Sequence, residues 1–393
     1  MGGSGGPLED VLVVDLSRAL AGPHAAMMLG DLGARVIKVE SPGGDDTRSW
    51  GPPFVGPEDG RESTYFLSCN RNKESITLDL KSDDGKDVLT RLVRRADVLV
   101  ENFRTGVLDR LGFGVARLHE LNPRLIILSI TGFGHDGPEA GRAGYDQIAQ
   151  GEAGLMSITG DAEPTRVGVP IGDLLAGMYG AYGVVAALHE RDRTGRGKVV
   201  RTSLLSAIVG VHAFQGTRYT VAGEVPGRTG NSHPSICPYG MFPCADGAIQ
   251  VAVGSEALWQ RFAKEFGLPA DAEGFADNAQ RVRNRDQVTA AITEAFAGHT
   301  ADELLARLDA CGVPAGRIRD LEQVYTWEQT KSQGLLLDVD HPTLGRITLP
   351  GLPVRFDDGG RTEHLPPPTL GRHGEAIRAW LNAEDGSADR GPS

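Results

Sequence analysis

Cysteine is scarce in this sequence, with four residues among 393, at positions Cys69, Cys237, Cys244 and Cys311. A secreted scaffold held together by disulfides would need a much denser set. The spacing of Cys237 and Cys244 fits no common zinc-binding pattern. Few thiols in a long chain are typical of a reducing compartment, so we expect a cytoplasmic protein with reduced cysteines.

Basic residues are also few, because 40 lysines and arginines stand against 52 aspartates and glutamates, for a net charge of −12. Nucleic-acid binding depends on a basic surface. We therefore expect no nucleic-acid partner. An anionic ligand would require a local basic pocket.

Hydrophobic runs are short. The most apolar one, residues 174–188, is about one helical turn too short to span a bilayer. Two polar residues, Asp173 and His189, flank it. We expect this segment to form a buried helix, and we expect no membrane partner.

The first half of the chain alternates short apolar runs with amphipathic segments. Ser82 is a suitable N-cap for the segment that follows it. Near-continuous apolar strands joined by helices predict a parallel sheet covered on both faces, and thus an α/β fold. The predicted strands are residues 11–16, 35–40, 75–80, 97–100, 125–130 and 198–202, and the predicted helices are 23–32, 83–95 and 174–189.

The composition changes near residue 222, where a stretch rich in Gly, Pro and Ser (223–238) begins. A chain of this length is too long for one ordinary core, so we expect a second, smaller domain after this stretch. Its predicted elements are a strand at 249–253 and helices at 256–266, 283–296 and 301–310, and a last helix is predicted at 373–382.

A glycine pattern follows one predicted strand. Gly132, Gly134 and Gly137 match the G-x-G-x-x-G spacing of dinucleotide-binding loops. That motif requires a helix to begin at its third glycine. Here Pro138 follows Gly137 and no helical period appears, so we favour a flexible loop over an NAD site.

Asp173 lies at the start of the helix predicted within 174–189 and is the strongest catalytic candidate. A structural interpretation makes it an N-cap, a position where Asp is common. The functional interpretation uses the same location, because a helix N-terminus stabilises a carboxylate and supplies amide donors. An ionised carboxylate can attack an activated acyl carbon.

Several segments together resemble the class III CoA-transferases, the CaiB/BaiF-type family that includes formyl-CoA transferase, carnitine CoA-transferase and α-methylacyl-CoA racemase. The resemblance covers residues 8–381, nearly the whole chain. The segments that carry it are VDLS (14–17), AGP (21–23), GARVIKVE (33–40), NKESITLDLK (72–81), ADVLVENF (96–103) and TGRG (194–197).

The resemblance implies a fold and an organisation along the chain. It implies a large Rossmann-like domain with a smaller α+β domain inserted, and an interlocked homodimer. The implied parts are a large-domain segment (8–222), a linker with the small domain (223–330) and a return to the large domain (331–385). The composition of the two ends, Gly/Ser-rich at 1–7 and polar at 386–393, predicts disordered tails.

The resemblance also implies an activity. In this family the aspartate of a Gly-Asp pair is the nucleophile, and Asp173 follows Gly172. It would attack an acyl-CoA donor to give an aspartyl anhydride and then an aspartyl-CoA thioester, from which CoA passes to a carboxylic acid acceptor. The implied substrate is a coenzyme A thioester, with no metal and no prosthetic group.

The resemblance further implies the residues that bind coenzyme A. They belong to three segments and to two single positions. The implied residues are Ala19, Leu20, Ala21, Leu78, Asp79, Leu80, Lys81, Asn102, Phe103, Arg104, Arg110 and Tyr145. A guanidinium suits phosphate geometry, which supports the assignment of the arginines. The alternative for Arg104 and Arg110 is a solvated surface.

The racemases of the family form the alternative function. They need an acid/base pair on either side of the substrate α-carbon, and they carry a Gly-His-Asp segment. Here the matching segment is Gly144-Tyr145-Asp146. A tyrosine is a poor general base at neutral pH, so we favour the transferase. A buried aromatic residue is the structural alternative for Tyr145.

Two departures from the family pattern bear on substrates. The family often has an arginine after the strand that ends at Glu40, but here Ser41 and Pro42 follow. Arg48, Arg71 and Lys73 are candidate replacements. Residues 227–238 also lack the glycine run of formyl-CoA transferase, which weakens any claim to oxalate or formyl substrates.

Overall fold

The computed structural model describes residues 5–357 and 360–388. The chain divides into two compact units. Within the described residues, the first unit contains the chain up to Leu155, Val167–Ala222 and the chain from Lys331 onward, and the second contains Met156–Arg166 and Gly223–Thr330. Parts of the two tails expected from the sequence, 1–4 and 389–393, lie outside the described residues.

The first unit is built on a six-stranded sheet in the order β5-β2-β1-β6-β7-β8. Every neighbouring pair in it is parallel. Its strands are β1 (Leu12–Asp15), β2 (Arg35–Glu40), β5 (Lys73–Thr77), β6 (Val98–Glu101), β7 (Ile126–Thr131) and β8 (Val199–Ser203). The α/β fold with a parallel sheet, predicted from the sequence, is thus confirmed.

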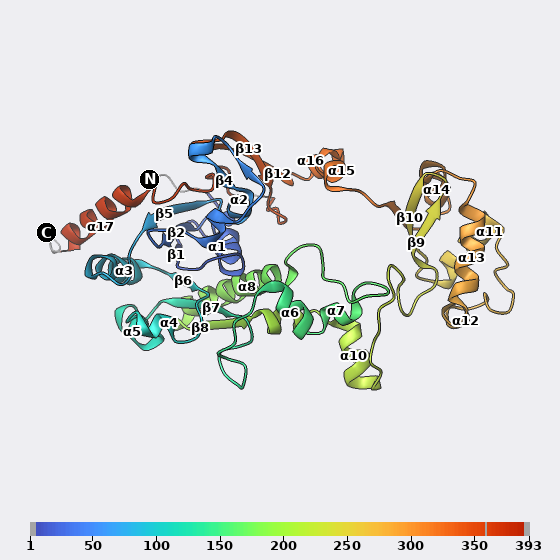
Figure 1. Ribbon diagram of the computed structural model, residues 1–393, viewed down its shortest axis with the longest axis horizontal. Coiled ribbons are helices and arrows are strands. Elements are labelled where there is room, and N and C mark those ends of the chain that lie inside the picture. The colour runs from blue at the N-terminus through green and yellow to red at the C-terminus, as the bar shows by residue number, and fades with distance from the viewer. Residues whose placement is uncertain (1–4, 358–359, 389–393) are drawn as a thin grey trace. The chain divides into compact units, whose positions relative to one another are not determined.

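Helices cover both faces of this sheet (Figure 1). Alternate residues of β1 face opposite cores, with Val13 in one and Val14 in the other, as the two-residue period of a strand requires. The helices on one face are α1 (Ala21–Asp31), α6 (Asp146–Glu152), α8 (Ile171–Thr194) and α9 (Leu204–Gly210). Those on the other are α3 (Asp83–Arg95), α4 (Val107–Arg110), α5 (Val115–Leu121) and α17 (Gly374–Ala388).

Short elements complete the first unit. They are the hairpin of β3 (Phe54–Val55) and β4 (Glu62–Ser63), the hairpin of β12 (Leu336–His341) and β13 (Gly345–Pro350), α2 (Thr64–Ser68), α10 (Ala213–Ala222), and the 3-10 helices η1 (Asp46–Ser49) and η2 (Glu58–Gly60). Helix α7 (Leu155–Ile158) lies at the boundary of the two units, and α16 (Glu328–Ser332) lies at a second boundary.

The second unit has a separate core. A three-stranded antiparallel sheet in the order β11-β10-β9 carries it, and aromatic side chains such as Trp259 and Phe296 fill it. Its elements are β9 (Tyr239–Cys244), β10 (Gly247–Ala252), β11 (Ala315–Arg317), α11 (Glu256–Phe266), α12 (Asn278–Arg283), α13 (Arg285–Phe296), α14 (Ala301–Ala310) and α15 (Leu321–Thr326).

Helix α8 is the longest helix and the one on which the candidate site depends. By length and composition alone it could cross a membrane, but its small residues pack against α1. A Cβ atom added at Gly177 would lie 2.7 Å from the Ala21 carbonyl oxygen, so only glycine permits this approach. The sequence predicted a buried helix here, yet one face is exposed, where Tyr182 retains 74% of its accessible surface.

Candidate active site

A cavity of about 660 Å³ lies where four parallel strands end. Ligands of open parallel sheets bind at this carboxyl edge. The last residues of β2 and the residues after β1, β2, β5 and β6 line it: Leu16, Ser17, Arg18, Lys38, Val39, Glu40, Ser41, Pro42, Gly44, Asp45, Leu78, Asp79, Leu80, Lys81, Asn102, Phe103, Arg104, Val107 and Leu111. The structure therefore brings together Leu78, Asp79, Leu80, Lys81, Asn102, Phe103 and Arg104, which the family resemblance implied as binding residues.

Two walls of this cavity are tied together by one amide side chain. The Asn102 Oδ1 atom accepts the Arg18 backbone N–H at 2.8 Å, and its Nδ2 atom donates to the Arg18 carbonyl at 2.7 Å. The Arg18 guanidinium lies 5.6 Å from the centre of the Phe103 ring. Arg18, Lys81 and Arg104 thus provide the local positive charge that an anionic ligand needs in an acidic chain.

Buried charges lie beneath the loop that follows β1. Lys38 Nζ donates to the Ser17 carbonyl at 2.9 Å and lies 2.9 Å from the Asp45 Oδ2 atom. The Asp45 Oδ1 atom accepts the Ala19 N–H at 3.3 Å. Ala19 has φ of 63°, a left-handed conformation that costs a non-glycine residue free energy. These contacts stabilise the loop in that conformation.

The three candidate replacements for the family arginine are all engaged elsewhere. Arg48 forms a bidentate pair with Glu40, with both hydrogen bonds at 2.7 Å. Arg71 pairs with Asp31, and Lys73 pairs with Asp15 at 2.9 Å. Breaking such buried pairs would leave a carboxylate uncompensated. None of these three cations lines the cavity, and their replacement of the family arginine in ligand binding stays a prediction.

Asp173 occupies the first turn of α8, but it is not the N-cap. The N-cap is Pro170, which has no side-chain hydrogen bond to offer. The Asp146 Oδ1 atom caps the helix instead, because it accepts the Gly172 N–H at 2.7 Å and the Asp173 N–H at 3.4 Å. Gln150 donates to the other Asp146 oxygen at 2.7 Å and orients it. The interpretation of Asp173 as an N-cap is thus wrong.

The electrostatics of Asp173 also differ from expectation. Burial and the nearby Asp146 carboxylate raise the pKa of Asp173 from 3.8 to about 7. The sequence analysis expected the helix N-terminus to keep this group ionised, but Asp146 takes the first amides of the helix. Among the residues that the structure describes, no hydrogen bond or ion pair to the Asp173 carboxyl is present.

Tyr65 is a further neighbour of Asp173. Burial raises the pKa of the Tyr65 phenol, and the Asp173 carboxylate raises it further. Tyr65 and Leu174 of α8 both pack against the buried cluster of Leu20, Met27 and Cys69. Leu20, in the loop that follows β1, thus lies in the same apolar cluster as Leu174 of α8. Arg18, two residues earlier in that loop, lines the cavity.

Five of the implied binding residues lie outside the set that lines the cavity. Arg110 is exposed on α4, although Val107, the first residue of that helix, and Leu111, which follows it, line the cavity. Tyr145 retains 68% of its accessible surface, so it is not the buried aromatic residue of the structural alternative. Tyr145 directly precedes Asp146, the residue that accepts the Asp173 backbone N–H and raises the pKa of Asp173. Ala19, Leu20 and Ala21 also fall outside the lining set.

The Gly132–Gly137 pattern is not a dinucleotide site. Strand β7 ends at Thr131 and the next helix, α6, begins only at Asp146. The helix N-terminus that would hold a pyrophosphate is therefore absent from this loop. Within residues 5–357 and 360–388, no group of three or more His, Cys, Asp and Glu side chains could hold a metal ion.

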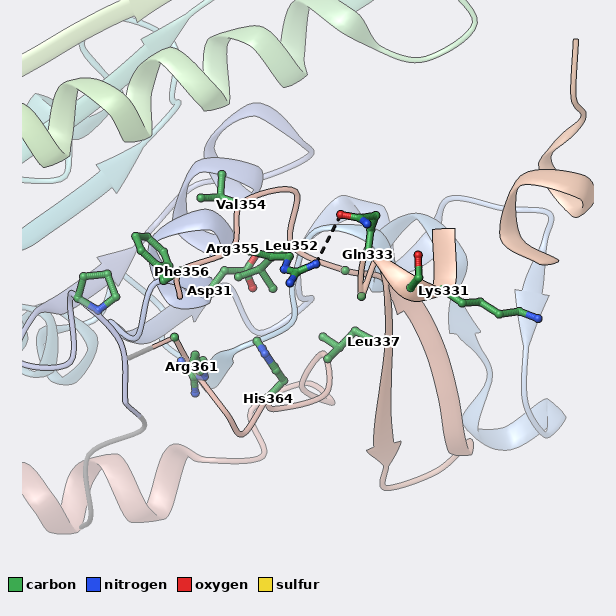
Figure 2. Close-up of a pocket in the computed structure, with 15 residues that line it drawn as sticks. Asp31, Lys331, Gln333, Leu337, Leu352, Val354, Arg355, Phe356, Arg361 and His364 are labelled. Atoms are coloured by element: carbon green, nitrogen blue, oxygen red, sulfur yellow. Dashed lines mark hydrogen bonds between the residues drawn. The ribbon is translucent and has the colours of Figure 1, made fainter. Parts of the chain in front are cut away.

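A second cavity of the first unit, about 380 Å³, contains none of the implied residues (Figure 2). Its charged side chains serve the fold. Asp31 pairs with Arg71, and Arg361 donates to the Gly30 carbonyl at the end of α1 at 2.7 Å. Figure 2 shows Arg355 turned toward Gln333, with 3.5 Å between Nη1 and Oε1.

Sequence reasoning missed Asp146, Tyr65 and Arg18 as site residues. Asp146 belongs to the Gly144-Tyr145-Asp146 segment, in which the sequence analysis considered only the tyrosine as a site residue. Arg18 lies between two segments that carry the resemblance. Tyr65 has no sequence pattern that predicts its proximity to Asp173, because that proximity depends on how α2 packs against α8.

A parallel sheet with a cavity at its carboxyl edge, lined in part by Arg18, Lys81 and Arg104, is typical of an α/β enzyme that binds an anionic ligand. Comparisons with known proteins give the family. The model of CoA-transferase family III matches residues 8–374. The crystal structure of a CaiB/BaiF family protein from Brucella suis has a TM-score of 0.86 and 42% identity, over 96% of this chain and 100% of that one.

Curated relatives agree. Succinyl-CoA:glutarate CoA-transferase of Homo sapiens is 41% identical over 93% of this chain and 84% of its own length. Succinate–glutarate CoA-transferase of Agrobacterium fabrum is 40% identical over 97% of each chain. Acetyl-CoA:oxalate CoA-transferase of Acetobacter aceti is 38% identical, also over 97% of each. The chain belongs to CoA-transferase family III, and it is a class III CoA-transferase.

Proposed function

We propose that this enzyme transfers coenzyme A between carboxylic acids through covalent intermediates on Asp173. The observation that carries the proposal is the state of that carboxyl group: it is partly buried, it has no hydrogen bond to any residue that the structure describes, and its pKa is raised to about 7. A desolvated carboxylate is more reactive toward an acyl carbon than a fully solvated one. Above neutral pH it is mostly ionised and able to attack.

The proposed sequence balances as follows. An Asp173 oxygen bonds to the donor acyl carbon and the C–S bond breaks, which gives an aspartyl anhydride and CoA thiolate. The thiolate then attacks the Asp173 carbonyl carbon and releases the donor acid, leaving an aspartyl-CoA thioester. The acceptor carboxylate displaces the thiolate to form a second anhydride. The thiolate finally attacks the acceptor carbon, which frees Asp173.

The substrates we propose are succinyl-CoA as donor and a short dicarboxylic acid such as glutarate as acceptor. Three relatives with similar coverage are named for succinate or succinyl-CoA with glutarate. Two more are named for succinyl-CoA with mesaconate. The cavity lined by Lys81, Asn102 and Arg104 is the proposed coenzyme A site, and Arg18 is added to the residues implied by the sequence.

We also propose the interlocked homodimer and the cytoplasmic location that the sequence analysis expected. Large apolar side chains are exposed on α8, α9 and α10 of the first unit, and they include Tyr179, Tyr182, Val209, Phe214 and Tyr219. An apolar surface of this kind marks an interaction site. Light scattering after gel filtration should give twice the chain mass, and a monomer would contradict the proposal. A reporter fusion that stays with the soluble cell fraction would support the location.

The test of the nucleophile is Asp173→Ala. Loss of the attacking carboxylate should reduce transfer from succinyl-CoA by several orders of magnitude, while calorimetry still detects coenzyme A binding. Asp192→Ala, an exposed change on the same helix, serves as the matched control and should retain activity. Transfer by Asp173→Ala at the wild-type rate would end the proposal.

A further inference from the structure

A buried carboxylate, that of Glu101, directly precedes in sequence Asn102 and Phe103, which line the coenzyme A cavity. Glu101 is the last residue of β6 and retains 7% of its accessible surface. Its Oε2 atom accepts the Phe103 N–H at 2.9 Å, which holds the Asn102-Phe103 turn in place. In the part of the chain that the structure describes, no ion pair to this carboxylate is found. Its charge therefore needs support from another source.

A short chain of hydrogen bonds leads from Glu101 toward the surface. The Ser129 hydroxyl donates to the Glu101 Oε1 atom. The Ser129 Oγ atom also lies 2.8 Å from the His135 Nε2 atom. Ser129 is 8% exposed, whereas His135 is half-buried on the glycine loop that the dinucleotide interpretation left without a role.

The hydrogen bonds that join Glu101, Ser129 and His135 allow two arrangements of their protons. In the first, His135 donates from Nε2 to Ser129, and Ser129 donates to an ionised Glu101. If His135 is an imidazolium, its Nε2 proton can pass to Ser129 while the Ser129 proton passes to Glu101. Neutral His135, with its proton on Nδ1, and neutral Glu101 then result, so the trio shares one proton between an exposed and a buried end.

Charged groups around the trio act in opposite directions. Burial raises the pKa of Glu101, and Asp109 on α4 raises it further. Burial lowers the pKa of His135, as does Arg201 on β8, whereas Asp136 on the same loop raises it. These shifts bring the affinities of the two ends for a proton closer together.

We propose that Glu101, Ser129 and His135 are positioning residues of the coenzyme A cavity, in which His135, acting through Ser129, supports an ionised Glu101 that holds the Phe103 amide. An ionised acceptor binds an N–H about twice as strongly as a neutral one. Since Asn102 also fixes the Arg18 backbone, loss of this support loosens both walls of the cavity. The inference rests on the proposed cavity assignment, but it does not depend on the chemistry of Asp173.

The experiment measures the Kd of coenzyme A by calorimetry at about pH 6 and pH 8, where no turnover is needed. His135→Gln keeps an N–H donor but cannot carry a charge, so it should weaken binding about fivefold at the lower pH and less at the higher. Glu101→Gln should weaken binding about fivefold at the higher pH and remove the difference between the two.

Two further variants make the result decisive. His119→Gln, a half-buried histidine on α5 that contacts the Leu125 carbonyl, should follow the wild type at both pH values. Asn102→Ala should weaken coenzyme A binding at both. An unchanged Kd in Asn102→Ala would overturn the cavity assignment itself. Weakened binding in Asn102→Ala, together with a His135→Gln that follows the wild type, would overturn only the positioning role.

Discussion

Replacing Asp173 by asparagine should stabilise the folded protein while it removes the proposed nucleophile. The wild-type carboxyl must ionise in a partly buried place beside Asp146, which raises its pKa from 3.8 to about 7. The folded state therefore holds a proton over a pH range in which the unfolded chain has lost it. Asparagine has a similar shape and never ionises, so it avoids this cost.

The sign and size of this change in stability follow from the difference between the pKa of Asp173 in the folded state and in the unfolded state. Below pH 3.8 the carboxyl is protonated in both states and contributes no penalty. As the pH rises from 3.8 to about 7 the penalty grows, and above that it stays constant. Its full value is about 4 kcal/mol, because each pKa unit is worth about 1.4 kcal/mol. Asp173 keeps partial contact with solvent, so we expect about half of this.

The assay is urea unfolding of Asp173→Asn and wild type at equal protein concentration, at about pH 5 and pH 8. The variant should gain about 2 kcal/mol at the higher pH and less than about 1 kcal/mol at the lower. The control is Asp192→Asn, exposed on the same helix, which should change stability by less than about 0.5 kcal/mol. Equal gains for Asp173→Asn at both pH values, or a loss, would refute the reasoning.

Other predictions concern the neighbours of this group. Asp146→Asn removes a like charge from Asp173, so the acidic limb of the kcat profile should move to lower pH; a limb that stays in place would show that burial alone sets it. Lys38→Met leaves the Asp45 carboxylate buried without its cation, and should cost about 3–5 kcal/mol of unfolding free energy. The double change with Asp45→Asn should recover part of that loss, and no recovery would contradict the pairing.

Local physics made much of the fold predictable. The periodicity and the Ser82 cap predicted α3 with its observed bounds, and Ser82 indeed accepts the Gly85 N–H at 3.0 Å. Helices α11 and α14 and strand β2 also match their predicted ranges. In each, the apolar pattern and the residues at the ends point to the same structure. Such agreement makes a helix or strand predictable from a single sequence.

Elements that depend on distant partners were missed. The short hairpins of β3 with β4 and β12 with β13 form by strand pairing, and apolar residues of β12 and β13 pack with Leu67 of α2. Helix α8 begins at Ile171, earlier than predicted, because Asp146 caps it from 26 residues away in sequence. A capping group supplied by another element leaves no mark at the helix start.

The same limit explains the site. The family resemblance gave seven of the residues that line the cavity, from Leu78–Lys81 and Asn102–Arg104, since strand ends at one edge of a parallel sheet converge. It could not show that Arg48 is held by Glu40, or that Asp146 opposes the ionisation of Asp173. Charges that determine a pKa come from side chains brought together by tertiary packing, so only the structure reveals them.

The central claim, that Asp173 bonds covalently to the acyl carbon, is tested most directly with an acceptor acid labelled with heavy oxygen in its carboxylate. In the proposed sequence each turnover leaves one acceptor oxygen on the Asp173 carboxyl. Mass spectrometry of the peptide that contains Asp173 should therefore find one heavy oxygen after a single turnover with succinyl-CoA and labelled glutarate. Transfer of coenzyme A to glutarate without label in that peptide would contradict the account.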